Sequence, residues 1–367
     1  MAQDSSLEVL NRQEYKDFSL DLQTKTAGEK QFVKAQFELT YGCNLHCVHC
    51  YTDPLNKPEL LKKEIPLEKA LQIIDKLQEE GILWLCFTGG EIFMRRDFLT
   101  IYDYAWNKGF LITLFTNGTL ITEKIVEHLA AKPPFSIEIS FHGATPDTFD
   151  KITKVKGSYE KCVEGIKMLL ARSLPVRLKT GAMTLNYGEL DQIKAFVESL
   201  GLKFQVSGVI YPRLDGDVSS LEYRLDPKDI LEIEFDREST GAESCAQELT
   251  PAVLGQVTPG DNLYRCSCGK LQTHIDPYGK AGACTWSRKG RFDLTEVSLQ
   301  QGMSELAEEL HSEKYPEHSA CHSCQAFAHC EKVVEMAHLE SGDTFQPVQH
   351  FCDLAFGRLE RVKKQLV

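Results

Sequence analysis

The sequence of 367 residues lacks a long apolar run: its apolar runs are much shorter than the roughly 20 residues needed to cross a bilayer. It also lacks an export signal, because the segment from Met1 through Lys30 is polar without a continuous apolar stretch. No long block of Lys or Arg occurs, and the formal net charge is −12, which excludes the electrostatic footprint of a protein that binds nucleic acid or a membrane surface. We therefore expect a cytoplasmic protein with neither kind of partner.

Cysteine, in contrast, is abundant. The chain contains 13 cysteines, and without an export signal metal ligation is a better explanation for them than disulfides. Cys43, Cys47 and Cys50 follow the spacing C-x3-C-x2-C, which supplies thiolates for only three irons of a four-iron cluster. The fourth iron would be open to another ligand. A zinc knuckle or a chance cluster of cysteines is the alternative.

A second motif, Phe87-Thr88-Gly89-Gly90-Glu91, follows the apolar run Ile82–Cys86, which we interpret as a buried strand that ends in a glycine turn. Glycine permits close approach of the backbone to a ligand, and Glu91 offers a carboxylate to an ammonium group. Together the two motifs resemble those of the radical SAM superfamily. The resemblance implies that S-adenosylmethionine (SAM) binds the open iron of a [4Fe–4S] cluster, and that Gly89, Gly90 and Glu91 bind its amino group.

Strand and helix patterns alternate from about residue 35 to about residue 210, which indicates an α/β fold with parallel strands. Six β/α units result, and the resemblance implies a partial (β/α)6 barrel. Thr122 and Ser158 are expected to cap two of its helices. We predict an N-terminal extension (1–34), a radical SAM partial barrel (35–235) and a C-terminal, loop-rich iron–sulfur cluster domain (236–367).

Further SAM contacts are expected at the C-terminal ends of the strands, where the reactive groups of β/α barrels gather. By resemblance, the candidates for these contacts are Thr116, Asn117, Ser140, His49 and Tyr51. The alternatives stay open: Thr116 and Asn117 fit an ordinary Asn-Gly turn, and His49 and Tyr51 could simply pack against the cysteine loop.

Further cysteines lie beyond the barrel: Cys266, Cys268 and Cys284, the last in Gly279-x4-Cys284, and then Cys321-x2-Cys324-x5-Cys330 and Cys352. Their arrangement resembles the SPASM extension of radical SAM enzymes that mature peptides, and it implies one or two auxiliary iron–sulfur clusters. The ligands of the distal cluster would be Cys321, Cys324, Cys330 and Cys352. Those of the proximal cluster would be Cys266, Cys268 and Cys284. Zinc is the alternative for the set of four.

The proximal set departs from the family pattern. Val334 stands where a fourth cysteine is usual. Three alternatives follow: the fourth coordination position is open, it is filled by Cys245, Glu335 or His338, or the cluster has only two irons. We favour the open or exchangeable site. Two other cysteines, Cys86 and Cys162, are interpreted as small buried apolar residues.

The resemblance implies that the enzyme reductively cleaves SAM to a 5′-deoxyadenosyl radical, which takes a hydrogen atom from a substrate. The expected substrate is a ribosomally made peptide or a protein side chain, and the auxiliary clusters would assist redox chemistry or substrate binding. We expect an external one-electron reductant. Recognition of a leader peptide would need a separate leader-binding protein or the barrel itself, because residues 1–34 are too few for a leader-binding domain. Alternatives are oxidation or decarboxylation of a small molecule such as a tetrapyrrole, and a non-enzymatic iron–sulfur or zinc protein.

Overall fold

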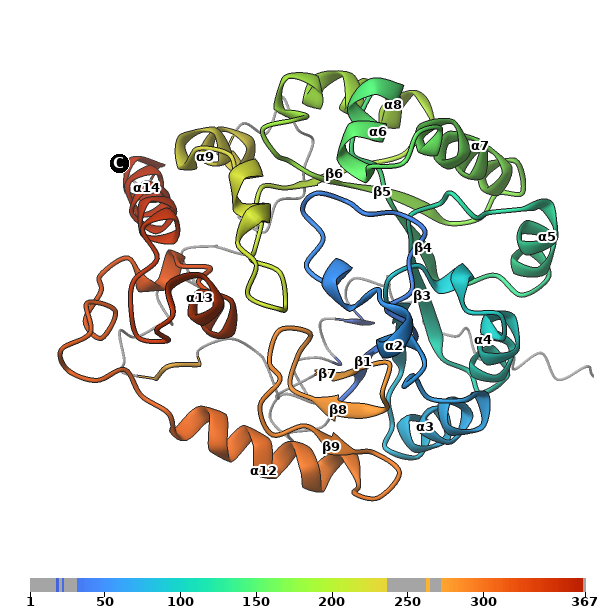
Figure 1. Ribbon diagram of the computed structural model, residues 1–367, viewed down its shortest axis with the longest axis horizontal. Helices are drawn as coiled ribbons and strands as arrows, with labels where there is room; N and C mark the ends of the chain where they lie inside the picture. Colours follow the sequence, from blue (N-terminus) through green and yellow to red (C-terminus); the bar gives the residue numbers. More distant parts are fainter. Residues whose placement is uncertain (1–17, 20–21, 23–31, 236–261, 265–271, 366–367) are drawn as a thin grey trace, which may run out of the picture.

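The computed structural model describes residues 18–19, 22, 32–235, 262–264 and 272–365 (Figure 1). Six strands pair side by side in chain order, and every pairing among them is parallel. These strands are β1 (Lys34–Glu38), β2 (Trp84–Thr88), β3 (Leu111–Thr116), β4 (Ser136–Ser140), β5 (Val176–Gly181) and β6 (Phe204–Ser207). Strand β6 forms an edge of the sheet in the described part of the chain, so the barrel is open. The predicted partial barrel of six parallel strands is confirmed.

Helices connect these strands and cover the outer face of the sheet (Figure 1). In α3 the residues Ala70, Ile73, Ile74 and Leu77 are buried at helical spacing, which is why this segment packs as a helix against the strands. The connecting helices are α2 (Pro58–Leu61), α3 (Leu67–Glu79), α4 (Phe98–Asn107), α5 (Glu123–Ala131), α6 (Pro146–Thr153), α7 (Ser158–Ala171) and α8 (Leu190–Ser199).

Two expected helix caps had different outcomes. Thr122 caps α5 as predicted, because its hydroxyl accepts a hydrogen bond from the backbone N–H of Ile125 at 3.4 Å. The prediction for Ser158 was wrong: it is the first residue of α7, and Gly157 holds the cap position. The carboxylate of Asp150, from α6, accepts hydrogen bonds from the N–H groups of Gly157 (2.6 Å) and Tyr159 (3.0 Å), so α6 supplies the cap of α7.

The sheet continues beyond the barrel on the free side of β1. Strand β7 (Gln272–Ile275) pairs with β1 in parallel, and β8 (Lys280–Gly282) and β9 (Phe292–Asp293) follow antiparallel, which gives nine strands in the described residues. The sequence analysis did not anticipate this extension. The chain that follows β8 turns back to the cysteine loop, where the ring of Trp286 lies 4.5 Å from that of Tyr51.

A buried polar network joins β1 to this extension. His274 Nε2 lies 3.3 Å from Glu38 Oε2, and both side chains are almost completely buried. An Nη2–H group of Arg291 faces His274 Nδ1 at 3.2 Å, so Nδ1 acts as the acceptor and the imidazole proton lies on Nε2, toward Glu38. Burial alone would raise the pKa of Glu38, but His274, Arg288 and Arg291 together lower it below its ordinary value. The carboxylate therefore stays ionised inside the sheet.

The described part of the C-terminal region combines irregular turns with four helices. They are α9 (Pro227–Phe235), α12 (Leu299–Ser312), α13 (Val334–Ser341) and α14 (Gln349–Gln365). Helix α14 packs against α9, and its Arg358 donates hydrogen bonds to Glu234, at 2.8 Å from Nε, and to Glu331. A second bidentate pair links Arg224 to Glu340 of α13 at 2.7 Å. These contacts attach the cysteine-bearing turns to the end of the barrel. No helix in the described residues is long and apolar enough to cross a membrane.

Candidate active site

The cysteine loop follows β1 and is held against α6. Two backbone hydrogen bonds anchor it, from His46 N to Thr153 O at 3.0 Å and from Val48 N to Ile152 O at 2.9 Å. A further bond, from Cys50 N to Cys47 O at 3.0 Å, turns the loop back on itself. The predicted ligands are therefore presented from one short, fixed segment.

The three thiols of this loop lie close enough to affect one another. Burial raises the pKa of Cys43 to about 12, and the neighbouring charges of Glu91 and Cys50 act in the same direction. Burial also raises the pKa of Cys47, again with contributions from Cys50 and Cys43. Such thiols ionise only when a positive centre compensates their charge, and cluster iron would supply that charge.

The donor set suits a cluster better than a single ion. In the described part of the chain, no three His, Cys, Asp or Glu side chains are arranged to hold one metal ion, as a zinc site would require. A [4Fe–4S] cluster instead binds each thiolate through a different iron atom, so its sulfur ligands lie farther apart. That Cys43, Cys47 and Cys50 hold such a cluster stays a prediction.

The glycine turn after β2 packs directly on the start of the cysteine loop. A Cβ atom on Gly89 would lie 2.2 Å from the carbonyl oxygen of Thr40, and one on Gly90 would lie 2.4 Å from that of Gly42. Hydrogen bonds from Gly90 N to Thr40 O (2.7 Å) and from Glu91 N to Gly42 O (2.8 Å) fasten the two segments together. The N–H groups of Gly90 and Glu91 are thus engaged within the protein. The backbone groups of this turn that could accept a hydrogen bond from an ammonium group are its carbonyl oxygens.

Glu91 points into the protein and joins the ends of β2 and β3. Its carboxylate accepts hydrogen bonds from the Thr116 hydroxyl at 2.8 and 2.9 Å, from Asn117 N at 2.7 Å and from Phe93 N at 3.2 Å. Burial raises the pKa of Glu91 to about 7, although these donors act in the opposite direction. The structure therefore assigns Glu91 a clear role in positioning Thr116 and Asn117. Its contact with SAM stays a prediction.

Asn117 extends this arrangement to the first cysteine. Its side-chain N–H group lies 3.7 Å from Cys43 Sγ and 3.0 Å from Asn44 Oδ1, and Asn44 in turn donates to Thr119 at 2.8 Å. The Asn-Gly turn is thus packed against the cysteine loop, whether or not Asn117 also contacts SAM. Hydrogen bonds to cluster sulfurs are one way in which a protein tunes reduction potential.

The remaining predicted SAM contacts lie around the same end of the barrel. Ser140 is exposed at the C-terminal end of β4. His49 packs its ring 4.7 Å from that of His142, and burial lowers the pKa of His49 to about 4, so its imidazole is neutral. The ring of Tyr51 lies 4.5 Å from that of Trp286. SAM contact stays a prediction for Ser140, His49 and Tyr51.

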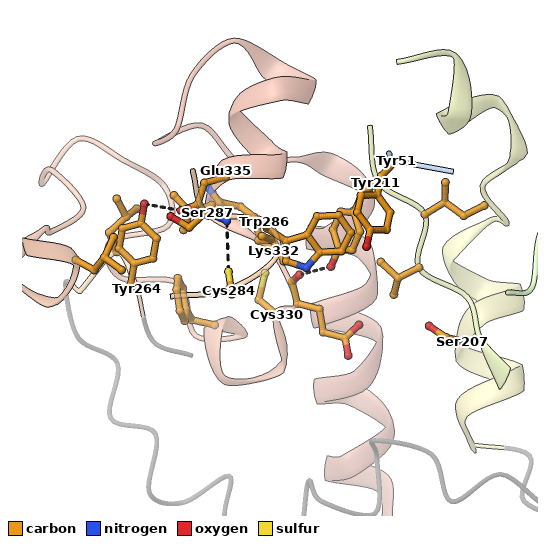
Figure 2. Close-up of a pocket in the computed structure, with 18 of the residues that line it drawn as sticks. Tyr51, Ser207, Tyr211, Tyr264, Cys284, Trp286, Ser287, Cys330, Lys332 and Glu335 are labelled. Atoms are coloured by element: carbon orange, nitrogen blue, oxygen red, sulfur yellow. Dashed lines mark hydrogen bonds between the residues drawn. The ribbon is translucent and has the colours of Figure 1, made fainter. Parts of the chain in front are cut away.

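A cavity of about 730 Å³ separates the cysteine loop from the C-terminal region (Figure 2). His49 and Tyr51 line it from the loop, and Cys284 and Cys330 line it from the opposite region. Figure 2 shows Tyr51 and Tyr211 at one end and Tyr264 at the other, with the two cysteines between them. The sequence analysis did not identify the aromatic lining. Only the position of Trp286, two residues after Cys284, could have indicated it.

The C-terminal cysteines fall into two groups. The four predicted distal ligands come together: burial and the charges of the three others raise the pKa of Cys352 to about 11. Cys352 comes from the first turn of α14, whereas the others lie on the preceding turns: Cys321, Cys324 and Cys330. The structure therefore gathers the residues of the predicted distal cluster.

Of the predicted proximal ligands, only Cys284 can be placed. It is buried, and its Sγ accepts a hydrogen bond from Ser287 N at 3.4 Å. Arg291 holds this segment through the carbonyl oxygens of Cys284 (3.0 Å) and Ser287 (2.9 Å). Glu335 lines the same cavity, whereas His338 is exposed. The other residues proposed for this cluster lie outside the described residues: Cys245, Cys266 and Cys268.

Comparisons with known proteins agree with this geometry. The model of the Radical SAM superfamily matches residues 37–200. The chain is 27% identical over 308 residues to the mycofactocin maturase MftC of Mycolicibacterium smegmatis, covering 80% of this chain and 76% of MftC. It is 32% identical over 165 residues to the AdoMet-dependent heme synthase of Methanosarcina barkeri, covering 45% of this chain and 47% of the synthase.

A solved structure supports the fold over nearly the whole chain. Streptococcus suis SuiB bound to its precursor peptide SuiA has a TM-score of 0.65 at 15% identity, covering 94% of this chain and 82% of SuiB. The three-cysteine loop, the glycine turn that packs on it and the open parallel barrel all lie within or beside the matched segment. Residues 37–200, which carry the cysteine loop and the glycine turn, therefore match the model of a radical SAM domain.

Proposed function

We propose that this enzyme uses SAM to modify a peptide by radical chemistry, in the cavity between the cysteine loop and the C-terminal cysteines. The observation that carries the proposal is that one cavity is lined by residues of both regions, His49 and Tyr51 on one side and Cys284 and Cys330 on the other. A substrate in this cavity would lie between the predicted SAM cluster and the predicted auxiliary clusters.

Cys43, Cys47 and Cys50 would hold the SAM cluster, whose open iron would take the amino and carboxylate groups of SAM. When bound, this pair supplies a 5′-deoxyadenosyl radical that removes a hydrogen atom from the substrate. The chain itself has to fix the geometry and exclude water. Glu91 helps to fix the geometry, because its carboxylate accepts a hydrogen bond from the backbone N–H of Asn117 beside the cysteine loop. The packed rings of Tyr51 and Trp286 form an apolar wall next to the loop, which helps to exclude water.

Auxiliary clusters complete the proposal. Cys321, Cys324, Cys330 and Cys352 would hold the distal cluster, and Cys284 would contribute to the proximal one. Because Cys330 and Cys284 line the cavity, these clusters would lie within reach of the substrate, where they could exchange an electron with it or bind it. An external one-electron reductant and a separate leader-binding protein are parts of the same proposal.

Two relatives support a peptide as the substrate. Mycofactocin maturase is similar to the chain through both the barrel and the C-terminal region, with 80% of this chain covered. SuiB, whose fold is alike over 94% of this chain, has been solved with a precursor peptide. The similarity to the heme synthase extends over only 45% of this chain. It favours a tetrapyrrole as the second candidate, which binding of iron coproporphyrin, followed by its absorbance spectrum, would test.

The test of radical SAM chemistry needs no substrate. Anaerobically reconstituted enzyme incubated with SAM and dithionite should form 5′-deoxyadenosine, measured by liquid chromatography. A variant with Cys43, Cys47 and Cys50 replaced by Ala should form none and should lose about four irons per chain. Native cleavage by this variant would contradict the ligand assignment. No cleavage by the native enzyme would favour an iron–sulfur protein that only transfers electrons.

A further inference from the structure

Among the described residues, three charged side chains line the cavity, and the contacts of two of them with more distant parts of the protein are considered first. Glu331 Oε2 accepts a hydrogen bond from Arg358 Nη2 at 2.8 Å. Lys332 Nζ donates to the carbonyl oxygens of Thr344 at 3.0 Å and Gln346 at 2.9 Å. Because these contacts already engage both groups, neither charge is well placed to bind a ligand.

Glu335 is the third charged side chain of the cavity. It lies in the first turn of α13, where the helix dipole favours a carboxylate, and its Oε1 accepts a hydrogen bond from the Tyr264 hydroxyl at 3.0 Å. Tyr264 brings no positive charge, and the ion pairs of the described residues do not include Glu335. A carboxylate that faces a ligand cavity can form a charge-assisted hydrogen bond with a cationic group of the ligand. Within the described residues, the carboxylate of Glu335 is therefore available to a cationic group of a ligand in the cavity.

The rest of the cavity wall is suited to the same kind of partner. The rings of Tyr51 and Tyr211 lie 4.5 and 4.9 Å from that of Trp286, so the three form a continuous aromatic surface. Aromatic faces attract cations and also cover the methylene groups of long side chains. Figure 2 shows this surface on the side of the two cysteines opposite Tyr264. An elongated ligand could contact both ends.

We propose that Glu335, held by Tyr264, binds a positively charged group of the peptide substrate: the side chain of a lysine or arginine, or an amino terminus. This inference rests on the proposed function, because it takes the cavity as the place where the peptide binds. The net charge of −12 would also draw a cationic peptide toward the enzyme. Glu335 thereby determines which residue of a peptide can be anchored beside Cys284.

The test measures peptide binding to anaerobically reconstituted, full-length enzyme by equilibrium dialysis. The probes are acetylated and amidated peptides Gly-Gly-Xaa-Gly-Gly with lysine, arginine, norleucine or glutamate at Xaa, and pentaglycine amide with a free amino group. One or more of the cationic peptides should bind at least about tenfold more tightly than the norleucine peptide, which has a similar length but no charge. The lysine, arginine and free-amine probes distinguish the three sources of charge.

Three variants test whether Glu335 causes the preference for cationic peptides. Glu335→Gln should abolish it, and Glu335→Asp should retain most of it. Glu331→Gln is the matched control, because it removes the same charge from the same cavity at a site that Arg358 already neutralises; it should leave the preference unchanged. Equal binding of the lysine, arginine, free-amine and norleucine probes by the native enzyme, or no detectable binding at millimolar concentration, would overturn the proposal. A preference that persists in Glu335→Gln would do the same.

The competing role of Glu335 is ligation of the proximal cluster, which the same samples can reveal. Iron content and the electron paramagnetic resonance spectrum of Glu335→Gln should match those of the native enzyme. A loss of iron or an altered spectrum would make Glu335 a cluster ligand and overturn the proposal. Formation of 5′-deoxyadenosine is measured in parallel without peptide. Its absence would count against the proposed function and would leave the binding comparison valid.

Discussion

Replacing Gly90 by alanine should disrupt the contact between the glycine turn and the cysteine loop. The new Cβ would lie 2.4 Å from the carbonyl oxygen of Gly42, a backbone atom that cannot move without shifting the loop. Relief of such an overlap costs about 1–3 kcal/mol. Movement of the turn also weakens the hydrogen bonds from Gly90 N to Thr40 O and from Glu91 N to Gly42 O. At about 1 kcal/mol for each bond, the total loss of stability is about 3–5 kcal/mol.

Gly188→Ala is the matched control for this prediction. Neither Gly90 nor Gly188 has a positive φ, and a Cβ at Gly188 would meet nothing within 4 Å. Circular dichroism of the anaerobic proteins should show a Tm lower by about 5 °C or more for Gly90→Ala and nearly unchanged for Gly188→Ala. Gly90→Ala should also retain less iron after reconstitution, because its cysteine loop is displaced. Equal Tm and iron content in the two variants would refute the reasoning.

Three further predictions test other parts of the site. Arg291→Met removes donors to the carbonyl oxygens of Cys284 and Ser287, so amide hydrogen exchange of residues 284–287 should accelerate by about tenfold or more; unchanged exchange would show that Arg291 does not hold this segment. Cys352→Ser should lower bound iron by about four atoms per chain while 5′-deoxyadenosine still forms, and full iron content would exclude Cys352 as a ligand. Folding raises the pKa of Glu91 from 4.5 to about 7, so the protonated carboxyl group favours the folded state. This contribution of about 3 kcal/mol to the free energy of unfolding should be complete below the unfolded pKa of 4.5 and lost as the pH rises through about 7. Glu91→Gln should lack this pH dependence. Parallel pH profiles of urea unfolding for the native protein and Glu91→Gln would contradict the prediction.

The sequence predicts those parts of the fold and the site that depend on neighbouring residues. The spacing of Cys43, Cys47 and Cys50 and the glycine turn at Gly89 and Gly90 are local patterns, and so are the alternating strands and helices of the barrel. Glu91 was identified, but its partners on β3 become visible only when β2 and β3 pair. Helix α6 was missed because its eight residues offer too short a periodic signal.

Other features arise from contacts between distant parts of the chain. The extension of the sheet depends on Gln272–Ile275, four residues that no local pattern assigns to the edge of β1. The cavity likewise joins Tyr51 with Trp286 and Glu335, which are far apart in the sequence. Patterns in a single sequence reflect local periodicity and composition. They therefore cannot establish which side chains from distant parts of the chain line the same cavity.

The pairing of β1 with β7 constrains how the protein is made. Lys34 of β1, among the earliest strand residues to leave the ribosome, pairs with Gln272, which is synthesised much later. Until then, one edge of β1 exposes unpaired N–H and C=O groups, a surface prone to association with other chains. Closing so long a connection is also slow, because its entropic cost precedes the contacts that repay it. Insertion of iron into the loop that follows β1 would therefore be expected only after most of the chain has been translated and β7 has docked.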